Sequence, residues 1–126
     1  MIEFHAMGMN YRHDKWFYVD RPHGSGDMLL LFFKTEAKAV INGETIIATP
    51  HSVLLYGKGT PQYYGAYNGD YKNHFLHMDC DEPEFFAYAG FPLDTVVTVP
   101  DQSEAEELLR LIGREEIGIS HRREEY

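Results

Sequence analysis

The stretch AKAVINGETIIAT, residues 37–49, decides the fold class of this chain. It holds short runs of alternating character on either side of Asn42-Gly43, a dipeptide most typical of a two-residue β-hairpin turn. Pro50 ends the second run, because proline has no N–H to donate to a strand ladder. The stretch therefore predicts an antiparallel β-hairpin.

Segments of strand length and turn residues lie on both sides of this hairpin. Asn68-Gly69 marks a further hairpin turn, and residues 1–27 show no clean period, which favours an arm with one or two short strands. The other expected strands are Met28–Phe33, Ser52–Tyr56, Gln62–Tyr67, Tyr71–Met78 and Thr95–Val99. Many short strands at this spacing predict a mainly β barrel or sandwich.

The end of the chain changes to a helical pattern. Asp101-Gln-Ser-Glu104 has the form of a capping box, and the apolar residues after it recur at helical spacing. Residues from Ser120 onward are typical of the start of a second helix. The apolar residues of this helical tail include Leu108, Leu111 and Ile112, and their stripe packs either on the β domain or against the same helix of a second chain.

Composition narrows the class of protein. The chain has 126 residues, 44% of them hydrophobic, which fits one folded domain rather than a disordered chain. Its formal net charge of −9 disfavours direct binding of this segment to nucleic acid. A single cysteine, Cys80, fits a reducing compartment, and no signal peptide or membrane-length apolar run is visible. The expected location is the cytoplasm.

Enzyme chemistry finds little support in the residue pattern. His74 and His77 are three apart, so on a strand they point to opposite faces and cannot share one metal ion. Cys80 stands between Asp79 and Asp81, whose charges disfavour a reactive thiolate. No Gly-x-Ser-x-Gly motif occurs in the sequence. The expectation is a protein that is not an enzyme, with no catalytic residues, metal or cofactor.

Aromatic residues supply the remaining chemical signal. Tyr and Trp combine a flat apolar face with a polar tip, so they can stack on a sugar ring while nearby groups bind its hydroxyls. The same residues also form ordinary core in a β protein, and composition alone does not separate the two readings. The aromatic candidates are Trp16, Tyr63, Tyr64, Tyr67 and Phe75.

Three segments, read in order, resemble the sensor domain of the arabinose-regulator (AraC-type) family of bacterial transcription regulators. The first, Asp20-Arg-Pro-His-Gly24, leads into the apolar strand at Met28. The second runs from Ile41-Asn-Gly-Glu through Pro50-x-x-x-Leu-Leu-Tyr to Gly59-x-Pro-Gln-x-Tyr-Gly65. The third is Asn73-His-Phe-Leu-His-Met78. The likeness covers roughly residues 12–113.

The resemblance implies a cupin-like, jelly-roll β-barrel without metal, followed by C-terminal helices. In this reading residues 1–20 are the arm and first strand, 21–100 the barrel and 101–126 the helical tail, together one effector-binding and dimerisation domain. The arm closes over a small-molecule effector, and two copies form a homodimer through the tail. DNA is bound by a separate helix-turn-helix domain that residues 1–126 do not contain, and no membrane is involved.

The resemblance also implies a ligand site. Arg21 and Tyr64 match positions that hold ligand in arabinose-binding relatives, and Asn73 and Phe75 lie on the matching strand. Since Asn73 and Phe75 replace the histidine and tryptophan found there, the implied ligand is a carbohydrate or glycan fragment rather than arabinose in particular. The predicted ligand-binding residues are Arg21, Tyr64, Asn73, Phe75, His77 and Trp16, with Asn73, Phe75 and His77 expected on one inward strand face.

Two other functions stay open at this point. One is a stand-alone metal-dependent cupin enzyme, such as a dioxygenase or isomerase, which metal analysis would distinguish. The other is a cupin-like module that has lost ligand binding and only dimerises. Its barrel mouth would be sealed by the same aromatic side chains, with no pocket between Arg21, Tyr64 and Phe75.

Overall fold

The computed structural model describes residues 2–88 and 90–99, together with residues 103, 106, 107 and 110. This part of the chain contains nine strands and one short helix, α1 (Glu84–Tyr88). The strands are β1 (Ile2–His13), β2 (Tyr18–Arg21), β3 (Met28–Phe33), β4 (Ala37–Ile41), β5 (Glu44–Ala48), β6 (Ser52–Tyr56), β7 (Gln62–Ala66), β8 (Tyr71–Cys80) and β9 (Val96–Thr98).

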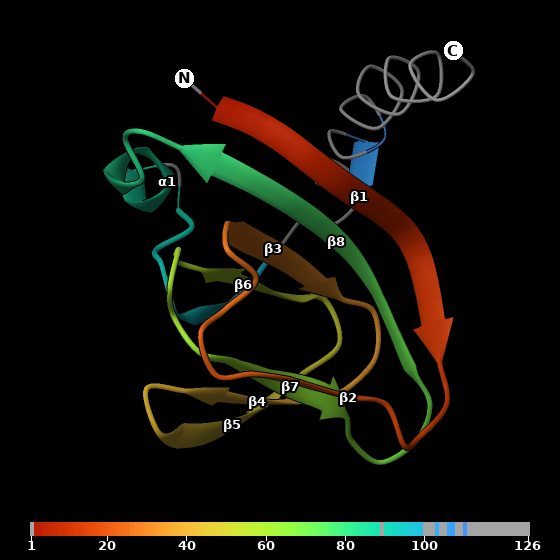
Figure 1. The fold of residues 1–126 in the computed structure, drawn as a ribbon. Coiled ribbons are helices and arrows are strands. Elements are labelled where there is room, and N and C mark those ends of the chain that lie inside the picture. Colours follow the sequence, from red (N-terminus) through yellow and green to blue (C-terminus); the bar gives the residue numbers. More distant parts are fainter. Residues whose placement is uncertain (1, 89, 100–102, 104–105, 108–109, 111–126) are drawn as a thin grey trace, which may run out of the picture.

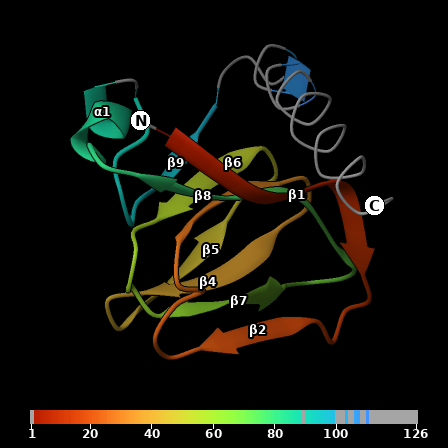
Figure 2. The same cartoon turned by 45° about the horizontal axis from the view of Figure 1, so that its top comes forward.

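The strands build two antiparallel sheets that face each other (Figures 1 and 2). One sheet has the order β1-β8-β3-β6-β9 and the other the order β2-β7-β4-β5. The predicted mainly β class is confirmed. Among the described residues, strand pairing does not close the two sheets into a barrel, so the arrangement is a sandwich.

The hairpin predicted at Asn42-Gly43 is confirmed. Ile41 pairs with Glu44, so Asn42 and Gly43 alone form the turn between β4 and β5. Asn42 has φ of 50° and Gly43 φ of 83°, the positive values that a two-residue turn of this kind requires. Asparagine and glycine adopt them at low cost because their side chains are short or absent.

Apolar residues pack on both faces of the five-stranded sheet. One cluster fills the space between the sheets and includes Leu29, Leu31 and Phe33 of β3. The second covers the opposite face, where Phe32 and Leu76 pack with residues around α1. Because β3 is buried on both faces, its sequence is a continuous apolar run rather than an alternating one.

The N-terminal segment is more ordered than its sequence predicts. β1 is 12 residues long and pairs with β8 from Ile2↔Cys80 to His13↔Tyr71. Its register shifts between Phe4 and Ala6 and again between Gly8 and Tyr11. Such bulges insert extra residues into one strand and break the two-residue period, which explains why no clean strand pattern is visible.

The predicted helical tail lies largely outside the described residues. Leu108, Leu111 and Ile112, the expected dimer contacts, are among those the structure does not describe. Glu106 is described, and its carboxylate forms an ion pair with Lys34 and lies 3.4 Å from Nε2 of His74.

Candidate functional site

Three of the predicted ligand residues share the inner face of β8. In the register with β3, Asn73 lies opposite Phe33 and Phe75 opposite Leu31, while His77 lies opposite Leu29. Those three partners are completely buried between the sheets. Since directly paired residues point to the same face, the predicted inward direction of this strand face is confirmed.

Tyr64 and Arg21 face them from the other sheet. Tyr64 is only 5% exposed and belongs to the inter-sheet core. Val19 of β2 packs on the same core, so Arg21, two residues later on that strand, shares its face. Burial raises the pKa of Tyr64, and the Arg21 guanidinium beside its hydroxyl opposes that rise. Arg21 and Tyr64 are therefore neighbours, as the sequence predicts.

Aromatic rings connect the two sheets. The ring of Tyr71 lies 6.3 Å from that of Tyr64, centroid to centroid, and 4.7 Å from that of Phe17, on which it stacks. Phe17 in turn stacks on His13 at 3.9 Å. Phe17 was not among the predicted residues, because it lies in the connection between β1 and β2, where no strand period points it inward.

Asn73 carries the least satisfied polar group of this region. The side chain is 3% exposed, and its Nδ2 donates to the hydroxyl of Tyr71 at 2.6 Å. Its Oδ1 is buried and has no hydrogen-bond partner. Turning the amide over would leave the nitrogen unpaired instead, so one end lacks a partner in either orientation. A buried amide oxygen without a donor costs about 1–3 kcal/mol of folding free energy.

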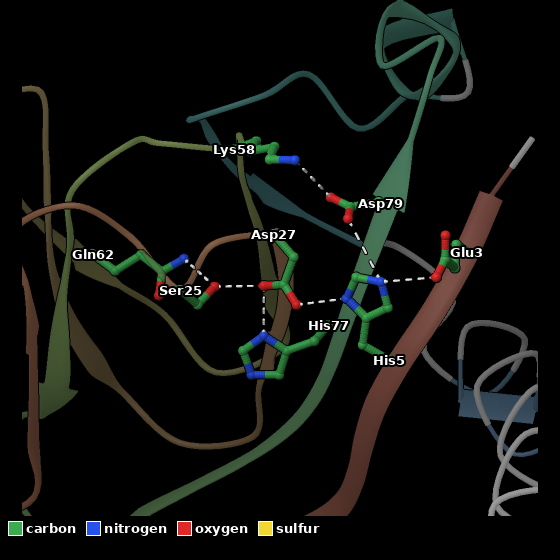
Figure 3. A network of polar contacts seen from close by, with 8 residues as sticks. All are labelled: Glu3, His5, Ser25, Asp27, Lys58, Gln62, His77 and Asp79. Atoms are coloured by element: carbon green, nitrogen blue, oxygen red, sulfur yellow. Dashed lines mark hydrogen bonds and ion pairs between the residues drawn. The ribbon is translucent and has the colours of Figure 1, made fainter.

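A series of side-chain hydrogen bonds leads away from Arg21, and Figure 3 draws it from Gln62 onward. Arg21 Nη1 donates to Oε1 of Gln62 at 3.0 Å, and Gln62 Nε2 donates to Oγ of Ser25 at 3.0 Å. Ser25 Oγ then donates to Oδ1 of Asp27 at 2.6 Å. Gln62 is fully buried, so this series is an internal feature and not a surface contact.

This series of hydrogen bonds ends at the carboxylate of Asp27, which two histidines share. Nδ1 of His77 donates a hydrogen bond to Oδ1 of Asp27 at 2.9 Å. Nδ1 of His5 donates to Oδ2 of Asp27 at the same distance. Burial alone would raise the pKa of Asp27, but the bonds from Ser25, His5 and His77 outweigh it and lower the pKa. The hydrogen bond to Asp27 is also the main reason that the pKa of His5 is raised above its ordinary value of 6.5.

A β-bulge brings His5 to this carboxylate. Phe4 pairs with Met78 and Ala6 with His77, so His5 is the extra residue of β1 at this point. A bulge re-aims the inserted side chain, and here it directs the imidazole toward Asp27. Its Nε2 lies 3.6 Å from carboxylate oxygens of both Glu3 and Asp79 (Figure 3). No local sequence pattern links residues 5, 27 and 77, so sequence reasoning missed this cluster.

His74 points to the opposite face of β8 from His77, as predicted. Its Nδ1 accepts the backbone N–H of Asn10 at 2.9 Å, which places the proton on Nε2, toward Glu106. Burial lowers the pKa of His74, and the nearby Glu106 carboxylate only partly compensates. A neutral imidazole therefore fits this position.

Trp16 is the predicted residue that does not join the others. It lies in the connection between β1 and β2, is 79% exposed, and has the ammonium of Lys15 5.2 Å from its ring. The neighbouring Phe17 takes the inward position instead. The structure thus places Arg21 beside Tyr64 on one sheet, and Asn73, Phe75 and His77 on the inward strand face of the other sheet.

Metal-ligand clusters and membrane-spanning helices are both absent from the described part of the chain. No group of three or more His, Cys, Asp or Glu side chains there has an arrangement that could hold a metal ion. No helix in this part is long and apolar enough to cross a membrane.

Comparison of the chain with protein-family models gives no match, and comparison with curated protein sequences gives none at a significant level.

Proposed function

We propose that this chain is the effector-sensing domain of a bacterial transcription regulator of the AraC type, and that it binds a carbohydrate between its two sheets. The observation that carries the proposal is the unpaired amide oxygen of Asn73. A buried polar atom without a partner persists at a cost, and a ligand that supplies the missing donor would remove that cost.

The surroundings of Asn73 support a carbohydrate. Phe75 is half-buried on the same strand face, and aromatic faces stack on the C–H side of sugar rings. Arg21 and Tyr64 lie on the facing sheet and offer polar hydrogens. A few convergent polar groups in an apolar aromatic setting are typical of a small-molecule site.

The strand order supports the cupin-like part of the proposal. β1 pairs with β8, β2 with β7, β3 with β6 and β4 with β5. This nested pairing is what results when one long hairpin is rolled into two facing sheets, which is the jelly-roll arrangement of cupins. The three sequence segments that resemble the sensor domain fall on β2–β3, β4–β7 and β8.

The rest of the proposal rests on the sequence. The apolar stripe with Leu108, Leu111 and Ile112 forms a homodimer contact, and a helix-turn-helix domain outside residues 1–126 binds the operator. The strongly acidic net charge of −9 fits a segment that does not itself contact DNA.

Thermal unfolding in the presence of a panel of neutral and acidic mono- and disaccharides tests the proposal. A ligand that binds only the folded state, at a hundredfold excess over its Kd, stabilises it by about 2.7 kcal/mol. The same ligand should give little shift with Asn73→Leu, which keeps the side-chain size but removes the unpaired oxygen. A panel without any stabilising sugar, or an unchanged shift in the variant, would contradict the assignment.

Metal analysis separates the proposal from a cupin enzyme. Protein purified without chelator should contain no stoichiometric metal. One equivalent of iron, manganese or zinc would overturn the sensor assignment and favour the enzyme.

A further inference from the structure

We infer that the ligand is an acidic sugar, a ring with several hydroxyls and one carboxylate, such as a hexuronate. This inference rests on the proposed function and adds the chemical class of the ligand. It follows from two unsatisfied groups on the inward-facing residues: a positive charge without a counter-charge, and a buried acceptor without a donor.

The positive charge of Arg21 has no counter-charge among the described residues. Its side-chain hydrogen-bond partners are both neutral: the amide of Gln62 and the hydroxyl of Tyr64. The nearest carboxylate along the hydrogen-bond chain is Asp27, which lies beyond both Gln62 and Ser25. Asp27 also already accepts one hydroxyl and two imidazole hydrogen bonds. Its charge is therefore engaged elsewhere.

The guanidinium of Arg21 has hydrogens left for a ligand. An arginine has five N–H donors in a fixed plane; Gln62 takes one of them and the Tyr64 hydroxyl takes another, so further donors remain. Gln62 is in turn held by Ser25, so Gln62 and Tyr64 fix the guanidinium while its remaining N–H groups are left for a ligand. A planar carboxylate is the group that matches this fork with two parallel hydrogen bonds.

Tyr64 strengthens the preference for an anion at this point. Its hydroxyl lies beside the Arg21 guanidinium, and burial keeps its pKa raised, so the phenol stays protonated and can donate. Two donor groups, one of them charged, therefore face the same place from the four-stranded sheet.

Asn73, on the five-stranded sheet, needs a ligand group that donates a hydrogen bond rather than one that accepts it. Its free Oδ1 needs a donor, and the groups of a sugar that donate are hydroxyls. Asn73 is bonded to the hydroxyl of Tyr71, whose ring centroid lies 6.3 Å from that of Tyr64. The inferred ligand must be one molecule that reaches Asn73 beside Tyr71 and Arg21 beside Tyr64.

Ligands that lack either the carboxylate or the hydroxyl groups satisfy only one of these two residues. A neutral sugar would leave the charge of Arg21 without a partner between the sheets, where solvation is reduced. An aliphatic or aromatic acid without hydroxyls would leave Asn73 Oδ1 unpaired. A hydroxylated acid satisfies both, and within the carbohydrates of the proposed function that ligand is a sugar acid.

Titration calorimetry with matched pairs tests the inference: D-galacturonate against D-galactose and D-glucuronate against D-glucose, at one ionic strength. At least one acid should bind about tenfold or more tightly than its neutral partner, as a charge-assisted bidentate contact implies. Arg21→Gln should abolish that preference, whereas Arg12→Gln, at a guanidinium that is 71% exposed on β1, should keep it.

The outcomes separate this inference from the proposed function. Neutral sugars that bind as well as their acids would overturn the acidic ligand and leave the carbohydrate sensor standing. Benzoate or butyrate binding as tightly as the sugar acids would overturn the need for hydroxyls. If neither acids nor neutral sugars bind, the carbohydrate assignment fails together with the inference.

Discussion

Gly8 of β1 lies directly opposite Phe75 of β8, and a Cβ atom added to Gly8 would come within 2.2 Å of Cε2 of the Phe75 ring. The ring thus occupies the space that any side chain at position 8 would need. This contact sets where the aromatic face of the proposed site lies, because the ring rests on the bare backbone of β1.

Gly8→Ala should destabilise the fold by about 1–3 kcal/mol, since the new methyl group forces the ring off its position. Chemical denaturation of four proteins checks the cause: the wild type, Gly8→Ala, Phe75→Leu and the double variant. With the smaller leucine in place, the cost of alanine at position 8 should fall by at least half. An equal cost in both backgrounds would show that the Phe75 ring is not what excludes a side chain there.

Tyr71 and Asn73 form a buried polar pair that should be replaceable by an apolar one. Asn73→Leu alone leaves the Tyr71 hydroxyl without its partner and should lower stability by about 1 kcal/mol. The double variant Tyr71→Phe with Asn73→Leu removes every polar atom of the pair and should be at least as stable as the wild type. A double variant less stable than Asn73→Leu would mean that the pair stabilises the fold and is not retained for binding.

His5 should make the fold less stable as the pH rises. Its pKa is raised above 6.5, mainly by the hydrogen bond to Asp27, so the folded state holds this proton more tightly than the unfolded state does. The contribution is fully present below pH 6.5 and disappears as the pH rises through the folded-state pKa. As the pH is raised from about 5.5 to 8.5, the denaturation midpoint should therefore fall less steeply for His5→Gln than for the wild type. His23→Gln, at an exposed histidine, serves as the matched control and should follow the wild type.

His74 should act with the opposite sign. Burial lowers its pKa below 6.5, so its protonation is less favourable in the folded state than in the unfolded chain. Stability is therefore lost as the pH falls from 6.5 toward the folded-state pKa, and is unaffected by this residue at higher pH. In His74→Gln the acid side of the stability profile should be flatter than in the wild type. A profile as steep as the wild type's on that side would contradict a neutral His74.

Leu111→Glu should weaken self-association if the C-terminal stripe forms the dimer contact. A twofold interface contains each residue twice, so one substitution places two charges in the contact. Analytical ultracentrifugation of the wild type should show a dimer at micromolar concentration, and the variant should shift toward monomer. Arg110→Gln, off the apolar stripe, is the control. A monomeric wild type, or a variant dimer of unchanged affinity, would count against this interface.

The sequence was most informative where structure follows from local chemistry. The turn at Asn42-Gly43 needs positive φ at both positions, and these residues supply it, so β4 and β5 were predicted to within a residue. The period of two along β8 likewise predicted which residues share a face, including Asn73 and Phe75. Regular backbone has a regular signature in sequence.

The parts that escaped prediction depend on contacts between distant segments. β1 was obscured by two bulges, whose inserted residues are recognisable only once the partner strand is known. The bond between His5 and Asp27 spans 22 residues and that between His77 and Asp27 spans 50. No spacing rule links such positions. Helix α1, five residues long, is too short to show a helical period.

The nested strand pairing also dictates an order in which the chain can fold. The turn between β4 and β5 closes over two residues, whereas β1 and β8 meet across most of the described chain. Closing a long loop costs more entropy than closing a short one, but each inner pair that forms brings the ends of the next pair together. We therefore expect folding to proceed outward from the hairpin. Substitutions at Gly43 should slow refolding, whereas substitutions in β1, such as that at Gly8, should mainly accelerate unfolding.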